Sequence, residues 1–398
     1  MIKEPTIAEV HAACAAAEAR IRQYHVKSYP DTNGDILIIS STYNGVWMEH
    51  VQDAQVWAKY DGSDPAIAMR GASLFLDRAL PNGQLPFRYT AVPQDTGYLY
   101  SQIQECVSFA TLCVEAYEMN PTARDFLKKA YTVCCAWDNW KVTHRMQTGR
   151  GLVEMYCGYD TGHDNSLRLA GMKYPRNICA DGAYMPTDCP VAPLLAVDMN
   201  ANFFGDRMAL AKMADILGKP EEAAAWRKKA KEIREKMMEL LFDEKDCFFY
   251  DMDKHGVRRK IKSIAITQIL DENVVDFDLG NEIYERHLAN PREFAAPYPF
   301  PSLSLDAERT APPLSGNDWG YYSQGNTALR TLRWMKRYGR EREMHDMMRK
   351  WISAWTGEEK TPFGQELDPI SGKPSDCSPW YSPTMLYYLS AARELGLV

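Results

Sequence analysis

Apolar residues recur every three or four positions through most of this chain, which is the spacing of helices that bury one face. Segments rich in Pro, Gly and Asn interrupt this period and mark the ends of helices. The pattern predicts helices at about residues 6–27, 65–80, 98–119, 122–145, 194–217, 221–241, 263–270, 279–288, 325–338, 340–355 and 382–395. Strand signals are few, and residues 247–250 are the clearest of them.

Short turns alternate with long loops between the predicted helices. Asn120-Pro121 and Gly218-Lys219-Pro220 each turn the chain directly from one helix into the next. A solenoid of helical hairpins would have uniformly short connections. We therefore expect an all-α fold of the (α/α)6 type, a toroid of inner and outer helices whose long loops form a pocket at one end. Because no linker, break in composition or strict repeat divides the sequence, residues 1–398 are expected to form one domain.

The composition narrows the range of partners. A net charge of -7 argues against a nucleic-acid partner, which favours a basic surface. No apolar run is long enough to span a bilayer, and the first residues lack the pattern of a secretion signal. The ten cysteines include no CxxC pair and the eight histidines have no ligand-like spacing. We expect reduced thiols in a cytoplasmic protein without a structural zinc.

Two acidic loops, far apart in the sequence, carry the candidate chemistry. In residues 159–168, Asp160 and Asp164 flank a glycine that allows a sharp bend. In residues 363–374, Glu366 stands just before a turn. Paired carboxylates among many tryptophans and tyrosines suggest a sugar-cleaving pocket, because one acid protonates the leaving oxygen while the other activates water or attacks carbon.

Each loop also has a purely structural interpretation. Asp164 could cap a helix that begins near Ser166, and Asp368 could simply shape the turn that follows Glu366. His163 could act as a base or a metal ligand, although a lone loop histidine is more often a hydrogen-bonding neighbour.

Further polar and aromatic side chains belong to the expected pocket wall, several of them in the loops at residues 43–50 and 306–325. Aromatic faces stack on the C–H patches of sugar rings, and polar groups bind sugar hydroxyls. The candidate substrate-binding residues are Trp47, Glu49, Tyr159, Asp160, His163, Asn165, Arg168, Asn200, Trp319, Tyr322, Gln324 and Trp380. Nucleotide-binding, zinc-protease and serine-hydrolase motifs are missing. We expect a small carbohydrate substrate, no cofactor and no metal.

Four segments of the chain resemble a known family. Residues 160–166, DTGHDNS, are similar to the ESGxDNS signature of (α/α)6-barrel glycosidases related to family 63 and to the trehalases of family 37. Residues 197–201, VDMNA, resemble their VDLNA segment, and residues 217–223, LGKPEEA, resemble a turn found there. Residues 366–372, ELDPISG, resemble the E-x-x-P-x-T-G turn that bears the family's base. The resemblance covers roughly residues 40–395.

This resemblance implies a glycosidase with Asp164 as general acid and Glu366 as general base. The reaction would invert the anomeric carbon of an α-linked glucoside, mannoside or related conjugate. An inverting pair leaves room for a water, so the two carboxyls should lie about 6.5–9.5 Å apart, and the acid should have a raised pKa. Asp160 replaces the family's glutamate, His163 replaces an apolar or aromatic residue, and the trehalases' PGGRF segment is missing, which leaves the identity of the sugar open.

Other functions remain open at this point. An (α/α)6 hydrolase of unsaturated uronyl sugars would hydrate a double bond with one aspartate and needs no opposed base. A sugar epimerase or lyase would need histidines in the pocket, such as His50 and His163. A non-catalytic carbohydrate-binding protein would tolerate the loss of Glu366.

Overall fold

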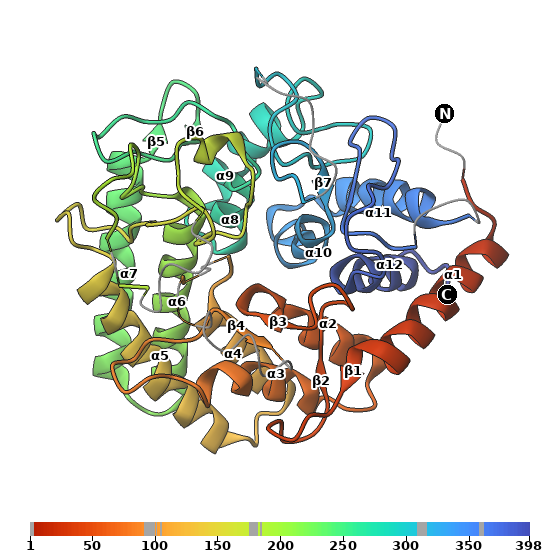
Figure 1. Cartoon of the computed structure of the whole chain (residues 1–398), viewed down its shortest axis with the longest axis horizontal. Helices are drawn as coiled ribbons and strands as arrows, with labels where there is room; N and C mark the ends of the chain where they lie inside the picture. The colour runs from red at the N-terminus through yellow and green to blue at the C-terminus, as the bar shows by residue number, and fades with distance from the viewer. Residues whose placement is uncertain are drawn as a thin grey trace.

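Two concentric rings of helices form the computed structural model, which describes residues 4–90, 100, 102–103, 106–174, 182–183, 185–308, 317–357 and 362–398 (Figure 1). The inner helices are α2 (Val51–Asp61), α4 (Phe109–Met119), α6 (Val197–Ile216), α8 (Ile266–Asp271), α10 (Gly325–Trp334) and α12 (Ser382–Glu394). Each inner helix contacts the next, and α12 contacts α2 again, so the ring is closed. The outer helices are α1 (Ile7–Arg20), α3 (Ala66–Leu76), α5 (Arg124–His144), α7 (Pro220–Leu240), α9 (Phe277–Ile283) and α11 (Glu341–Trp355). The predicted (α/α)6 toroid is confirmed.

Short elements fill the loops between these helices. Four antiparallel ribbons pair β1 (Val26–Lys27) with β2 (Ile36–Leu37), β3 (Gly45–Trp47) with β4 (Arg88–Thr90), β5 (Phe242–Asp243) with β6 (Phe248–Phe249), and β7 (Ser323–Gln324) with β8 (Glu366–Leu367). Short helical turns are η1 (Ile21–His25), η2 (Met48–His50), η4 (Leu167–Leu169), η5 (Tyr284–Leu288) and η6 (Lys336–Tyr338). The β7–β8 ribbon joins two long loops that the sequence places far apart.

Local sequence explains where several helices begin. Thr6 and Glu9 form a reciprocal capping box that satisfies free N–H groups at the start of α1. The Asp276 side chain accepts from the backbone N–H of Leu279 at the start of α9. Pro220 occupies the first turn of α7, where its missing N–H has no cost.

Two predicted helices differ at their ends from the structure, and one helix was not predicted. The helix expected at residues 6–27 ends at Arg20, and a π-helical turn and β1 follow it. The one expected at 98–119 begins only at Phe109, because the Ser108 side chain caps α4 there; residues 98–99, 101 and 104–105 of that prediction lie outside the described part. Helix α2 was not predicted, because its polar residues are buried along with its apolar ones and leave no amphipathic pattern.

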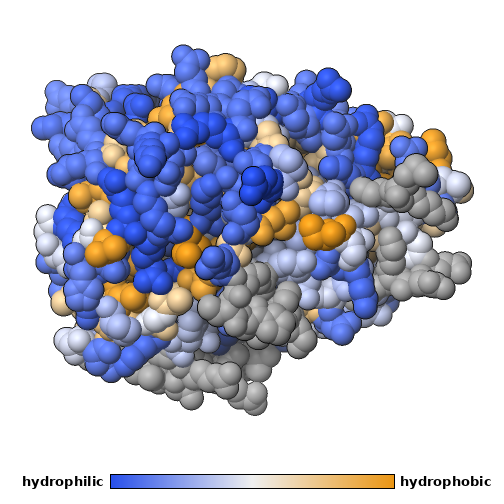
Figure 2. Space-filling model, turned by 90° about the horizontal axis from the view of Figure 1, so that it is seen from above, coloured by the Kyte–Doolittle hydropathy of each residue, from blue (hydrophilic) through white to orange (hydrophobic). Residues whose placement is uncertain are grey.

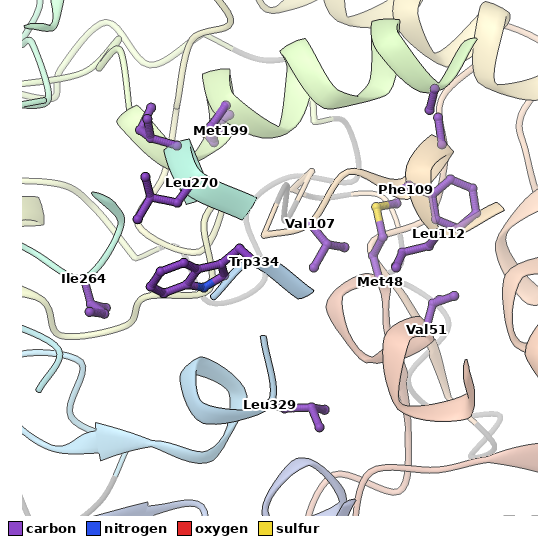
Figure 3. Packing of buried hydrophobic residues seen from close by; sticks show 14 of the residues in the cluster. Met48, Val51, Val107, Phe109, Leu112, Met199, Ile264, Leu270, Leu329 and Trp334 are labelled. Atoms are coloured by element: carbon purple, nitrogen blue, oxygen red, sulfur yellow. The ribbon is translucent and has the colours of Figure 1, made fainter. Parts of the chain in front are cut away.

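Apolar side chains from successive inner helices meet in the spaces between them. Met48 of η2 and Val51 at the start of α2 belong to the same buried cluster as Phe109 and Leu112 of α4, and Figure 3 shows them close together. Trp334 of α10 is fully buried in that cluster. The cluster runs through the inner ring, so it holds the helix starts in fixed positions around the ring.

One face of the molecule is mostly hydrophilic. Figure 2 shows that apolar residues form small separate patches among hydrophilic ones on this face. None of the helices in the described residues combines the length and the apolar composition that a membrane crossing requires.

Candidate active site

A small pocket lies where the inner helices α2, α10 and α12 begin. It has a volume of about 70 Å³ and is lined by Ile39, Tyr43, Trp47, Glu49, His50, Gly162, Asp164, Asn317, Trp319, Asn326, Gln365 and Tyr381. Helix N-termini carry partial positive charge and free N–H groups, which suits a site that binds oxygen atoms. Larger hollows of about 450, 670 and 360 Å³ lie elsewhere between helices, and the described residues that line these three include no predicted site residue.

Asp164 projects from a tight loop into this pocket. Gly162 on one side has a φ of 69° and Asn165 on the other has a φ of 65°, so the chain turns twice through the left-handed region that these two residue types tolerate best. The backbone N–H of Trp319 donates to the Asp164 carbonyl at 3.2 Å. The Asp164 side chain caps no helix, because η4 begins after Ser166 without a side-chain cap.

The surroundings of Asp164 favour its protonated form. Burial raises the pKa of its carboxyl to about 7, a hydrogen bond from Asn317 lowers the pKa, and the nearby Glu49 charge raises it. Asn317 Nδ2 donates to Asp164 Oδ2 at 3.1 Å. Oδ1 is buried and has no hydrogen-bond partner among the described residues. Asp164 therefore has the environment of a carboxylic acid that keeps its proton near neutral pH.

Glu366 is fully buried on β8, beside the pocket rather than on its wall. Gln324 Nε2 donates to its Oε2 at 2.6 Å, and the backbone N–H of Asp318 donates to the same oxygen at 3.2 Å. Ser375 Oγ donates to Oε1 at 2.9 Å. Burial raises the pKa of Glu366, and these donors lower it. Since side chains alternate along a strand, the preceding Gln365 is the one that lines the pocket.

Glu49 is the second carboxylate on the pocket wall. Its Oε2 accepts from Arg330 at 2.8 Å and from Asn326 at 3.2 Å, whereas no described residue donates to Oε1. Burial raises the pKa of Glu49, and the Arg330 charge lowers it. His50 beside it donates to or accepts from the Tyr381 hydroxyl at 2.8 Å, and burial holds the pKa of His50 well below its ordinary value. The neutral imidazole and the Glu49 oxygen suit sugar hydroxyls.

Trp47 and Trp319 give the pocket an aromatic wall. Trp47 ends β3 and meets the Tyr43 ring edge to face, with centroids 5.4 Å apart. Trp319 stacks on His163 at 4.2 Å, with the ring planes 13° apart. Burial and the Arg168 charge hold the pKa of His163 well below its ordinary value. His163 thus supports Trp319 as a neutral ring, which disfavours it as a base.

Three predicted substrate-binding residues are structural instead. Asp160 is fully buried, pairs with Arg145 at 2.7 Å and accepts from backbone N–H groups. Arg168 forms buried ion pairs with Asp198 and Asp251. Asn200 donates to and accepts from the backbone of residue 153. These buried contacts anchor the acidic loop within the protein, although Nε of Arg168 has no hydrogen-bond partner among the described residues.

The other predicted residues surround the pocket without lining it. Tyr159 packs on Tyr174, Tyr322 packs on Tyr321, and Trp380 lies near Phe363 and the guanidinium of Arg20. Exposed Asn165 donates to the carbonyl of Asn317 at 2.9 Å, and buried Gln324 holds Glu366. In the predicted wall loop at 306–325, residues 309–316 lie outside the described part.

Residues missed by the sequence argument include Ile39, Asn326 and Tyr381. The last two stand in or just before the first turn of an inner helix, where the amide of Asn326 and the hydroxyl of Tyr381 bond each other at 3.0 Å. Their position at predicted helix starts is a signal that could have identified them. Asp368 shapes the following turn, since its Oδ1 accepts from the backbone N–H groups of Ile370 and Ser371.

Comparisons with solved structures identify the same architecture. The mannosylglycerate hydrolase of glycoside hydrolase family 63 from Thermus thermophilus, solved with Tris, aligns with a TM-score of 0.74 at 17% identity, over 95% of this chain and 99% of that one. The neutral trehalase of Saccharomyces cerevisiae aligns with a TM-score of 0.65 at 14% identity, over 92% of this chain and 76% of that one. At these identities the likeness shows the fold.

Sequence comparison adds the family. An uncharacterized protein of Borreliella burgdorferi is 28% identical over 134 residues, which make up 33% of this chain and only 27% of that protein. A family model described as the mannosylglycerate hydrolase MGH1-like glycoside hydrolase domain matches residues 49–382. That match covers most of the chain and includes Glu49, Asp164 and Glu366, so this protein belongs to the MGH1-like glycoside hydrolases.

Proposed function

We propose that this glycoside hydrolase cleaves an α-glycosidic bond with inversion, using Asp164 as general acid and Glu366 as general base. The observation that carries the proposal is the environment of Asp164, whose burial raises its pKa to about 7. A carboxyl that is protonated near neutral pH can deliver its proton to the leaving oxygen of a glycoside.

Residues 317–319 link the two proposed catalytic carboxyls. Asn317 donates to Asp164, and the backbone N–H of Asp318 donates to Glu366. Glu366 accepts three hydrogen bonds, and an ionised carboxylate has about four lone-pair sites, which leaves room for one water. This water would reach Glu366 past Gln365, the neighbour that lines the pocket. Glu49, the other pocket carboxylate, would bind hydroxyls of the sugar.

The proposed substrate is a small α-mannoside or α-glucoside of an acid such as glycerate. The support is the MGH1-like family and the fold shared with a mannosylglycerate hydrolase. Trp47 and Trp319 provide aromatic faces for one sugar ring, and Oε1 of Glu49, which lies 3.9 Å from Nδ1 of His50, provides an acceptor for its hydroxyls.

The test is hydrolysis of mannosylglycerate, glucosylglycerate and α-linked disaccharides, with the first anomer identified by proton NMR. We expect the β-sugar to form first, and we expect Asp164→Asn and Glu366→Gln to lose turnover. If Glu366→Gln keeps full turnover while Glu49→Gln loses it, Glu366 is not the base and Glu49 takes its place. Cleavage of unsaturated uronides alone would favour the uronyl hydrolase, and sugar binding without cleavage would favour a carbohydrate-binding protein.

A further inference from the structure

Two side-chain amides connect Asp164 to the opposite wall of the pocket. The Tyr43 hydroxyl donates to Gln365 Oε1 at 2.9 Å, and Gln365 Nε2 donates to Asn317 Oδ1 at 3.0 Å. Asn317 Nδ2 in turn donates to Asp164 Oδ2 at 3.1 Å. All three hydrogen bonds point the same way, from the phenol toward the carboxyl, and all four residues line the pocket. We call this chain of residues the amide relay.

We propose that Gln365 and Asn317 are positioning residues that keep Asp164 Oδ2 as a hydrogen-bond acceptor and so assign the transferable proton to Oδ1. This inference rests on the proposed role of Asp164 as the general acid. It gives Gln365 a function distinct from that of its neighbour Glu366.

The first members of the relay match this direction. The Tyr43 hydroxyl and the Cys377 thiol, which lies 3.4 Å away, both donate to the amide oxygen of Gln365. An amide that receives donors at its oxygen turns its NH2 group the other way, toward Asn317. The Asn317 amide is then oriented as well, with its oxygen toward Gln365 and its NH2 toward Asp164.

The orientation of Asn317 makes the two oxygens of Asp164 unequal. A proton on Oδ2 would face the N–H of Asn317, and two hydrogens cannot share one hydrogen bond. The proton of the neutral acid therefore belongs on Oδ1, which is buried and has no partner among the described residues. A glycosidic oxygen that reaches Oδ1 would meet the proton in the orientation that transfer needs.

The relay also opposes the other influences on the charge of Asp164. Burial and the Glu49 carboxylate favour its neutral form, whereas the N–H of Asn317 favours its charged form. Among the described residues, Tyr43, Cys106 and Tyr174 also interact electrostatically with Asp164, and burial raises the pKa of each, so they are neutral at working pH. Loss of the Asn317 donor should therefore raise the pKa of Asp164, and the acid should stay protonated to higher pH.

The test measures kcat/KM against pH for Asn317→Leu and Gln365→Glu. Asn317→Leu removes the donor, and we expect the decline in kcat/KM at high pH to move upward by about one pH unit. Gln365→Glu is nearly isosteric and presents only acceptors, so Asn317 should turn its NH2 toward it and away from Asp164. The same upward movement is expected, and the added negative charge increases it. Gln23→Glu at an exposed position of η1 adds the same charge outside the pocket lining and should leave the decline unchanged.

The outcomes separate this inference from the proposed function. If folded Gln365→Glu and Asn317→Leu proteins show the wild-type decline at high pH while Asp164→Asn is inactive, the relay does not act on the acid. If Asp164→Asn keeps its activity, the proposed function itself fails. Should Asn317→Leu not fold, Gln365→Glu alone decides, because it preserves shape and volume.

Discussion

Replacing the candidate acid with its amide should stabilise the protein at alkaline pH. A carboxyl whose pKa rises from 3.8 to about 7 on folding binds its proton more tightly in the native state than in the unfolded chain. Stability is therefore lost as pH rises from about 4 to about 7, because the native state must then hold a buried charge. Asp164→Asn removes this titration, and we expect a gain of ~2–4 kcal/mol in unfolding free energy at pH 8, the lower figure allowing for partial solvent access.

The assay is urea unfolding of wild type and Asp164→Asn at pH 5 and pH 8, followed by tryptophan fluorescence. The advantage of the variant should be smaller at pH 5 and largest at pH 8, where it corresponds to about 2–5 °C in thermal midpoint for a chain of this length. Asp368→Asn serves as the matched control, since hydrogen bonds hold the pKa of Asp368 below its ordinary value, so that change should destabilise instead. An equal advantage for Asp164→Asn at both pH values would refute the buried-acid interpretation.

Three further predictions address activity and packing. If Asp164 is the acid, kcat/KM should fall tenfold per pH unit above about pH 7, and a profile flat to pH 9 would contradict this. Gly205→Ala places a Cβ 1.9 Å from Glu272 Oε2, and we expect calorimetry to show a loss of ~1–3 kcal/mol in unfolding free energy. In the control Gly218→Ala the added Cβ meets no atom within 4 Å. That variant should lose only the ~1 kcal/mol that a left-handed backbone costs a residue other than glycine. Arg168→Leu leaves two buried aspartates without their cation and should cost ~3–5 kcal/mol in chemical unfolding; a loss below ~1 kcal/mol would mean that these carboxylates find other partners or protons.

Outer helices could be predicted from the sequence because they keep a solvent face. In α11, Met344, Met348 and Trp351 are buried while Glu341 and Arg342 are exposed, which is the period expected of an amphipathic helix. The inner α2 buries its polar residues too, so its sequence shows no such contrast. Helix α2 was therefore the one inner helix of the described ring that the pattern did not predict.

The candidate acid could be proposed from its loop, but the roles of its neighbours depend on distant partners. Asp160 looks as reactive as Asp164 in the sequence, yet Arg145 neutralises it in the core. The sequence also cannot reveal which of Gln365 and Glu366 faces the pocket, because that depends on how β8 pairs with β7. A single shift in strand register would exchange the two side chains.

Ring closure has a consequence for how the pocket is made during synthesis. His50, just before α2, bonds the Tyr381 hydroxyl, just before α12, across 331 residues of sequence. The ribosome adds about 5–20 residues per second, so the early half of the pocket waits tens of seconds for its partner. During that time Glu49 and His50 lack the contacts from α10 and α12 that bury them in the finished ring. In the nascent chain these polar groups stay hydrated, and they lose their water only when α10 and α12 cover them. Catalytic competence therefore arises late, when α12 docks.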